Sequence, residues 1–154
     1  MLKVGQKAPA FSLLNDQGKK TSLSSCKGKK VVLFFYPKDD TPGCTMEACS
    51  FRDGLTAIKR SGAIVLGVSP DSVESHKKFS KKFDLNFLLL SDAEKKMLEA
   101  YGVWKEKSMY GRKYMGVERT TFVIDAAGKI AAIFPKVKVA QHYDEVLNVL
   151  SEMS

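Results

Sequence analysis

A cysteine that directly follows a predicted strand is the residue of this chain with the clearest chemical potential. Cys44 comes after an apolar, β-rich run at 31–36 and a turn-forming stretch at 39–43, and the residues beyond it repeat with helical spacing. Thr41 and Pro42 suit the cap and the first turn of that helix. Cys44 is therefore expected in the first turn, where free backbone N–H groups and the positive dipole end favour a thiolate. The pattern indicates thiol-based redox chemistry.

A second cysteine follows on the same predicted helix. Cys49 lies five residues after Cys44, which rotates it by roughly 140° around the helix axis, onto the polar side with Arg52 and Asp53. An exposed thiol near a reactive one is suited to capture its oxidised form. An idle surface cysteine is the alternative for Cys49, as a small core side chain is for Cys44. Cys26 stands in a polar run and receives no role.

Metal and disulfide-exchange motifs fit these cysteines less well. The ferredoxin pattern that C-x4-C opens needs a further cysteine where Arg52 stands, and Glu47 occupies the second position of a C-x-x-C motif. His76 and His142 each align with an apolar helix face and are interpreted as structural. No nearby histidine completes a zinc site, so we expect no metal.

Length and composition bound the class of protein. The chain has 154 residues, of which 44% are hydrophobic, enough for one domain spanning 1–154 with a full core. It has neither a signal-peptide pattern nor an apolar run long enough to span a membrane, so a cytoplasmic protein is expected. The net charge of +8 comes from short lysine pairs that are scattered along the chain, which indicates a solvated surface. A nucleic-acid partner remains the alternative for this charge.

The predicted elements alternate between strands and helices. Helix-length connections between buried strands imply parallel pairing, and turn signals near 15–18 and 125–128 imply hairpins. We therefore expect an α/β fold, with a mixed central sheet and helices on both faces. The stretch at 102–118 is irregular and is expected to be a long loop with short strands. The expected strands are 11–14, 20–23, 30–36, 63–68, 87–90, 120–124 and 129–134, and the expected helices are 42–60, one opening at 69–71, 91–101 and 140–150.

A resemblance to a known family rests on the stretch around Cys44. The pattern Pro37-x-x-x-Thr41-x-x-Cys44 resembles the active-site signature of the peroxiredoxins. The run at 35–45, together with Cys49, is similar to the peroxiredoxin Q subfamily, also called bacterioferritin comigratory protein. Further similar segments lie at 4–11, 67–71, 75–79 and 119–125.

The resemblance implies a fold, an activity and a set of site residues. The fold would be thioredoxin-like, and the activity would be reduction of hydrogen peroxide and organic hydroperoxides. Cys44 would be the peroxidatic cysteine and Cys49 the resolving one, joined in an intramolecular disulfide that thioredoxin reduces. Pro37, Thr41 and Arg119 would shape the peroxide pocket. A monomer that needs no metal, haem or flavin is expected.

The physical chemistry of one of these residues supports its implied role. Arg119 is a permanent cation just before a predicted buried strand, where it can stabilise the Cys44 thiolate and the charge on a leaving oxygen. Two other functions stay open from the residues alone. One is a thiol–disulfide oxidoreductase acting on proteins, and the other is a basic redox sensor that binds nucleic acid.

Overall fold

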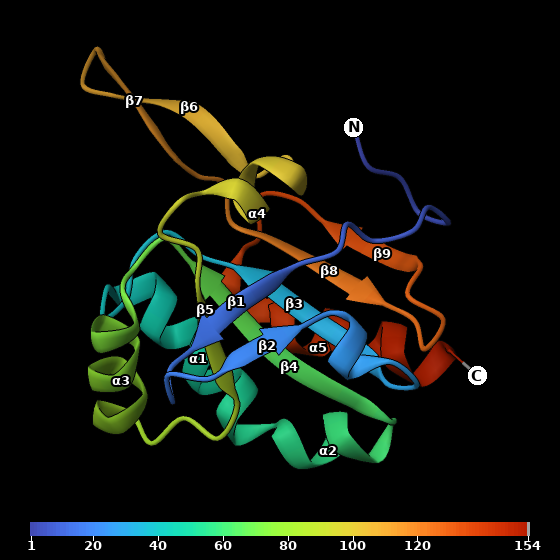
Figure 1. Cartoon of the computed structure of the whole chain (residues 1–154). Coiled ribbons are helices and arrows are strands. Elements are labelled where there is room, and N and C mark those ends of the chain that lie inside the picture. Colours follow the sequence, from blue (N-terminus) through green and yellow to red (C-terminus); the bar gives the residue numbers. More distant parts are fainter. Residues whose placement is uncertain (154) are drawn as a thin grey trace.

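The computed structural model describes residues 1–153, which form a seven-stranded mixed sheet with helices on both faces (Figure 1). The strand order is β2-β1-β5-β4-β3-β8-β9, and a separate two-stranded sheet pairs β6 with β7. The strands are β1 (Ser12–Asn15), β2 (Lys20–Ser22), β3 (Lys30–Phe35), β4 (Ala63–Ser69), β5 (Leu88–Ser91), β6 (Trp104–Met109), β7 (Arg112–Val117), β8 (Thr120–Ile124) and β9 (Ile130–Phe134). The helices are α1 (Pro42–Asp53), α2 (Leu55–Arg60), α3 (Val73–Lys82), α4 (Lys96–Ala100) and α5 (Val139–Glu152), with a short 3-10 turn at Ser24–Cys26.

The central strand β3 joins the parallel and antiparallel parts of the sheet. It pairs in parallel with β4, which pairs in parallel with β5, and it pairs antiparallel with β8 on its other side. The parallel crossovers and the two terminal hairpins are thus as predicted. Side chains alternate along β3, so Leu33 and Phe35 enter the core on one face of the sheet while Phe34 and Tyr36 enter the core on the other.

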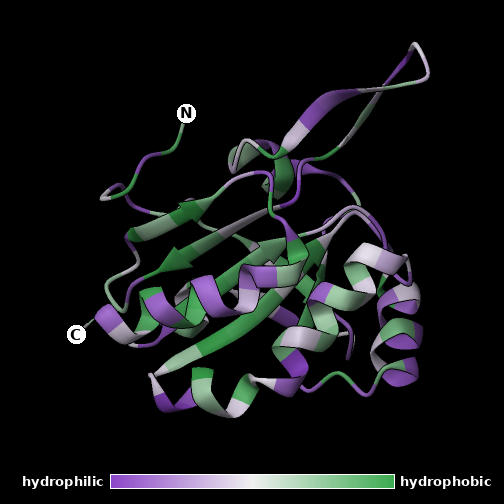
Figure 2. Cartoon of the chain, turned by 180° about the vertical axis from the view of Figure 1, so that it is seen from behind, coloured by the Kyte–Doolittle hydropathy of each residue, from purple (hydrophilic) through white to green (hydrophobic). Residues whose placement is uncertain are grey.

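The two cores are covered by different helices. Phe51 of α1, Ile58 of α2, Phe79 of α3 and Val146 of α5 pack on the face that holds Phe34. On the opposite face the helical cover comes from α4, through Met97 and Leu98. Figure 2 shows the apolar strands running between these amphipathic helices. The expected thioredoxin-like arrangement, a mixed sheet with helices on both faces, is confirmed.

Two predicted helices differ from the observed ones. The helix expected over 42–60 is interrupted at Gly54, where the carbonyl accepts a 2.7 Å hydrogen bond from the Tyr143 hydroxyl and the Tyr143 ring fills the space of a side chain. The helix expected over 91–101 is only five residues long, because Lys95 adopts a left-handed conformation with φ of 63°. Both differences depend on single residues, Gly54 and Lys95, whose effect on the backbone is not visible in the apolar periodicity of the sequence.

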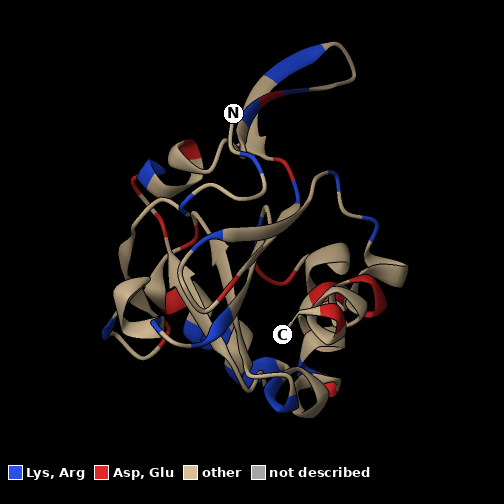
Figure 3. Cartoon of the chain, turned by 90° about the vertical axis from the view of Figure 1, so that its right-hand side faces the viewer, with Lys and Arg blue, Asp and Glu red and all other residues tan. Residues whose placement is uncertain are grey.

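The stretch expected as a long loop contains a regular hairpin. Strands β6 and β7 project away from the main sheet (Figure 1), and the tip exposes Met109 and Tyr110. Lys and Arg residues are distributed over this hairpin, several loops and the helices (Figure 3). None of the helices within residues 1–153 combines the length and the apolar character that a membrane crossing requires.

Candidate active site

Cys44 occupies the position that the sequence predicts. The loop after β3 leads directly into α1, in which Pro42 takes the first position and Thr41 the cap position. Cys44 is the third residue of the helix and is only 1% exposed. Its sulfur therefore lies at the positive end of the helix dipole, inside the core that packs against Phe34.

A guanidinium group lies against the buried sulfur. Arg119 Nη2 donates a hydrogen bond to Cys44 Sγ at 3.3 Å, and Nη1 donates to Glu47 Oε1 at 2.7 Å. The antiparallel pairing of β8 with β3 sets Thr120 opposite Phe35, so Arg119 stands beside the strand end from which the loop to Cys44 leaves. Burial opposes the positive charge, but Glu47 and Cys44 outweigh it and raise the pKa of Arg119 further. A sulfur held by a permanent cation is suited to nucleophilic attack.

Glu47 is a site residue that the sequence analysis missed, except as the residue that rules out a C-x-x-C motif. It lies three residues after Cys44, and this i, i+3 spacing on a helix was the available signal. Its side chain is 1% exposed. Burial raises the pKa of Glu47 to about 7, although Arg119 pulls in the opposite direction. Within the described residues, Oε2 has no hydrogen-bond partner, so only one of the two carboxylate oxygens of Glu47 bonds Arg119.

The missing side chain of Gly43 makes room for the guanidinium. A Cβ atom at this position would come within 3.2 Å of Arg119 Nη2. That distance is tighter than ordinary van der Waals contact, so a Cβ atom at position 43 would require the guanidinium to shift by a few tenths of an ångström. Gly43 thus permits the contact between Arg119 and Cys44.

Pro37 and Thr41 lie in the loop between β3 and α1, as the motif predicts. Their side chains make fewer of the expected contacts around Cys44. Thr41 caps α1 through its backbone, whereas its hydroxyl donates to the Lys38 carbonyl oxygen at 2.8 Å and makes no capping bond. Pro37 is partly buried, directly after β3. The proposed contacts of these two residues with the sulfur or a peroxide stay predictions.

The three cysteines lie in different environments. Cys49 is partly exposed on α1, and its thiol is free, as are those of Cys44 and Cys26. Cys26 belongs to the core on the opposite face of the sheet from Cys44. Residues five apart in an intact helix have Cα atoms about 8–9 Å apart and point roughly 140° away from one another. Cys44 and Cys49 therefore share a helix but do not face each other.

The two histidines differ in their relation to the site. His142 on α5 bonds Thr121 Oγ1 at 2.7 Å, a structural contact as expected. His76 contacts Asp39, which belongs to the loop before Cys44, at 2.7 Å. His76 was expected to be structural and lies outside the motif around Cys44, because it is far from Asp39 along the chain.

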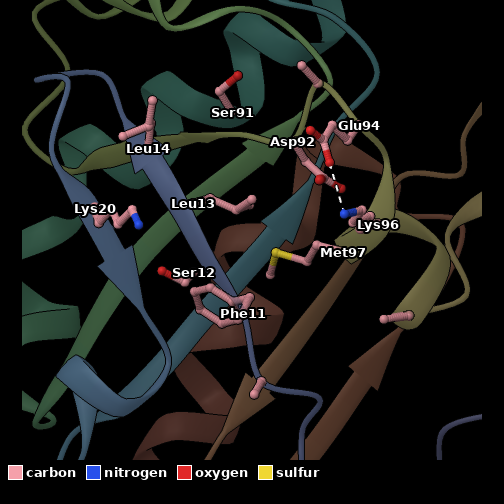
Figure 4. Close-up of a pocket in the computed structure, with 13 residues that line it drawn as sticks. Phe11, Ser12, Leu13, Leu14, Lys20, Ser91, Asp92, Glu94, Lys96 and Met97 are labelled. Carbon is pink, nitrogen blue, oxygen red and sulfur yellow. Dashed lines mark ion pairs between the residues drawn. The ribbon is translucent and has the colours of Figure 1, made fainter.

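A sizeable cavity lies elsewhere on the molecule. It measures about 530 Å³ and is lined by β1 and the segment around α4, including Phe11, Leu13, Asp92 and Met97 (Figure 4). None of its lining residues contacts Cys44 or Arg119 through a hydrogen bond. This cavity is therefore separate from the surroundings of Cys44.

Comparisons with known proteins match this geometry. The sequence model of the AhpC/TSA family matches residues 4–133. A "putative peroxiredoxin bcp" of Coxiella burnetii is 54% identical over 97% of this chain and 99% of its own, and the peroxiredoxin Bcp of Bacillus subtilis is 51% identical over 99% and 98%. The solved structure of the Xanthomonas campestris bacterioferritin comigratory protein, described for alkyl peroxide reduction, has a TM-score of 0.91 at 40% identity, covering 97% of this chain and 98% of that one.

Proposed function

The chain belongs to the AhpC/TSA family, as a thiol-dependent peroxidase of the Bcp or peroxiredoxin Q group, and on that premise we propose a catalytic cycle with assigned residues. Cys44 is the peroxidatic cysteine and Cys49 the resolving one. The substrates are hydrogen peroxide and organic hydroperoxides, and thioredoxin is the reductant. The proposal includes a single domain over residues 1–154 and a cytoplasmic monomer. The resemblance noted from the sequence is confirmed by these relatives.

The first step oxidises Cys44. Its thiolate attacks one oxygen of the peroxide, the O–O bond breaks, and Cys44 becomes a sulfenic acid while the other oxygen leaves as hydroxide or alkoxide and takes up a proton. Arg119 supports this step in two ways. It stabilises the thiolate before attack, and its N–H groups lie where charge develops on the leaving oxygen. The observation that carries the proposal is the 3.3 Å hydrogen bond from Arg119 Nη2 to the buried Cys44 sulfur.

The second step requires the helix to open. Cys49 attacks the sulfenic sulfur, forming a disulfide and releasing water. A disulfide needs Cα atoms about 4.4–6.8 Å apart, which an intact helix does not allow for residues five apart. The first two turns of α1 must therefore unwind, while Phe51, Leu55 and Ile58 keep the rest of the helical segment docked in the core. Thioredoxin then reduces the disulfide by thiol exchange.

A comparison of wild type with Cys49→Ser tests the cycle. Thioredoxin-linked peroxide consumption should be sustained in wild type, whereas Cys49→Ser should oxidise Cys44 once, accumulate the sulfenic acid and stop. Amide exchange should show residues 45–49 protected in the reduced enzyme and open in the disulfide form. Full thioredoxin-linked turnover by Cys49→Ser would remove Cys49 from the cycle. Equal protection in both redox forms would contradict the opening.

A further inference from the structure

A buried polar cluster lies beneath the loop that leads into Cys44. We call Asp39, Asp71 and His76 the loop tether. Asp39 belongs to the loop between β3 and α1, Asp71 to the turn after β4, and His76 to α3. The side chain of His76 is fully buried and that of Asp39 is 4% exposed. The tether therefore joins three segments that are remote in sequence beneath the start of the active-site loop.

The hydrogen-bond partners of His76 define its protonation. Its Nε2 lies 2.9 Å from the Leu90 carbonyl oxygen, which can only accept, so Nε2 carries a hydrogen. Its Nδ1 lies 2.7 Å from Asp39 Oδ2. Asp39 also accepts from the Ser75 hydroxyl at 2.8 Å and from the Tyr36 hydroxyl at 2.6 Å. Donors converging on both oxygens favour a charged carboxylate, and the ring facing two acceptors is then an imidazolium.

The charged state agrees with the balance of forces on the ring. Burial opposes the charge, but the hydrogen bond and negative charge of Asp39, the Leu90 carbonyl and the charge of Asp71 outweigh it, so the pKa of His76 is raised. The other titratable group facing the ring is Tyr36, whose hydroxyl oxygen is 3.5 Å from Nδ1. Burial and Asp39 raise the pKa of Tyr36 well above its ordinary value, so the phenol stays neutral.

The second carboxylate of the tether acts on the loop backbone. Asp71 Oδ2 accepts from the backbone N–H of Asp39 at 2.8 Å and from the Ser69 hydroxyl at 2.7 Å. Asp39, Asp71 and His76 are close enough together to suggest a cation site. His76 Nδ1 and Asp39 Oδ2 already bond each other, and Asp71 Oδ2 already accepts from the Asp39 N–H and the Ser69 hydroxyl, so these atoms are engaged in a hydrogen-bond network.

The loop that the tether holds has a costly conformation. Asp40, directly after Asp39, has φ of 58°, in the left-handed region that non-glycine residues seldom occupy. The carbonyl of Thr41 accepts the first backbone hydrogen bond of α1, from Thr45 at 2.8 Å. A displacement of Asp39 would therefore move the residues that set the first turn of the helix, and Cys44 with them.

We propose that Asp39 and His76 are positioning residues for the peroxidase reaction, because their buried ion pair fixes the loop that sets the first turn of α1 and hence the place of Cys44 beside Arg119. The inference rests on the proposed role of Cys44. Neither residue touches the reacting atoms, and both act through the loop. Loss of the pair would slow the attack of Cys44 on peroxide more than it slows reduction of the Cys44–Cys49 disulfide, for which the first turns of α1 have already opened.

The chain offers a matched control one residue away. Asp40 Oδ2 pairs with Lys82 Nζ at 2.8 Å, so it joins the same loop to the same helix, but both side chains are about half exposed. Exposed ion pairs contribute little, whereas removing one partner of a buried pair leaves an uncompensated charge. Asp39→Asn and Asp40→Asn thus make the same chemical change in a buried and in an exposed bridge.

The experiment measures the rate constant for oxidation of reduced enzyme by hydrogen peroxide, and separately the rate of disulfide reduction by thioredoxin. Asp39→Asn should lower the oxidation rate about tenfold and increase amide exchange at residues 40–45, while disulfide reduction changes less than twofold. Asp40→Asn should oxidise within twofold of wild type. Tyr101→Phe removes a hydrogen bond to the Pro9 carbonyl oxygen in the core on the opposite face of the sheet, and it controls for stability loss alone. Side-chain nitrogen NMR should show that both ring nitrogens of His76 stay protonated to a higher pH than those of a solvent-exposed histidine.

Several results would overturn the proposal. One is equal oxidation rates in Asp39→Asn and Asp40→Asn, and another is a His76 ring that loses its second proton at the same pH as a solvent-exposed histidine or at a lower pH. If Asp39→Asn does not fold, Ser75→Ala removes one donor to the Asp39 carboxylate and should slow oxidation about threefold, and an unchanged rate would count against the tether. Failure of the proposed function is distinguishable, because wild type itself would then show no peroxide-dependent oxidation at Cys44.

Discussion

Two buried cysteines, Cys26 and Cys44, lie on opposite faces of the same sheet. Their surroundings differ in the group that hydrogen-bonds the sulfur. Cys26 is 6% exposed and Cys44 is 1% exposed. The Cys26 sulfur donates to the Ser22 carbonyl oxygen at 3.5 Å, whereas the Cys44 sulfur accepts from Arg119 at 3.3 Å. Burial raises the pKa of Cys26, and Ser25 and Lys29 offset this only in part. The fold thus holds one thiol next to an acceptor and the other next to a cation.

The difference teaches what a reactive buried cysteine requires. Burial disfavours a thiolate, because a charge loses its hydration inside the protein. At Cys44 the lost hydration is replaced by the Arg119 guanidinium and by the helix N-terminus. At Cys26 the Ser25 hydrogen bond and the charge of Lys29 replace the lost hydration only in part, and no cation bonds the sulfur directly in the described chain. We therefore expect reactivity to follow from the partner of the sulfur and not from its depth.

The largest expected effect comes from removing the reactive sulfur. Cys44→Ser should lower the rate of peroxide reduction by on the order of 10³-fold or more, because a serine hydroxyl is neither ionised nor soft enough to attack an O–O bond. Rapid-mixing measurement of peroxide consumption with excess thioredoxin gives the rate. Retained turnover by Cys44→Ser with any reductant would contradict the contrast drawn between Cys44 and Cys26. The reactive thiol would then have to be sought at Cys26 or Cys49.

Removal of the cation should make Cys44 more like Cys26. Arg119→Ala should slow oxidation of Cys44 about a hundredfold, since a charged hydrogen bond to the sulfur and a donor to the leaving oxygen are lost together. Arg119→Lys should recover only part of the rate, because one ammonium does not reproduce the two-pronged contact with Cys44 and Glu47. The rate constant as a function of pH is the measurement. An unchanged rate and pH profile in Arg119→Ala would remove the cation from the explanation.

The carboxylate partner of Arg119 should give a smaller kinetic effect and a clear pH dependence of stability. Burial holds the pKa of Glu47 at about 7, above its ordinary 4.5, so folding favours the protonated form. The resulting stabilisation is complete below pH 4.5 and is lost as pH rises through about 7, by up to about 3 kcal/mol. Glu47→Gln does not titrate, so the difference in unfolding free energy between wild type and Glu47→Gln should change across this range. Urea unfolding from pH 4 to 8 measures it.

The effect of Glu47→Gln on the oxidation rate is a separate prediction from its effect on stability. Glu47→Gln keeps a neutral acceptor for Arg119 and should slow oxidation roughly tenfold or less, less than Arg119→Ala does. A stability difference between wild type and Glu47→Gln that stays constant from pH 4 to 8 would mean that Glu47 keeps an ordinary pKa when folded.

The smallest effect is expected on the other face of the sheet. Cys26→Ser should leave the oxidation rate within twofold of wild type and cost about 1 kcal/mol of stability, from burial of a hydroxyl in place of a thiol. Thioredoxin-linked turnover and urea unfolding test the two parts. A tenfold loss of turnover would show that Cys26 takes part in the cycle and that the contrast with Cys44 is incomplete.

Much of the fold could be predicted because its signals are local. The apolar runs of β3, β4 and β8 and the helical spacing after Pro42 predicted these elements and their mixed pairing. One error arose where a distant residue decides the local backbone. Tyr143 on α5 occupies the space at Gly54 and interrupts the predicted helix. The β6–β7 hairpin was predicted only as a loop with short strands, since its exposed strands lack the apolar alternation of a buried one.

The site divides in the same way between sequence and tertiary structure. The sequence by itself determined that Cys44 begins a helix, that Cys49 follows on the opposite side, and that Arg119 precedes a buried strand, because each depends on neighbours along the chain. Only the pairing of β3 with β8 brought Arg119 to the sulfur, and only the packing of α3 under the loop brought His76 to Asp39. The burial that raises the pKa of Glu47, and the partners that raise the pKa of His76 against its burial, depend on how all these elements pack, and no local pattern encodes them.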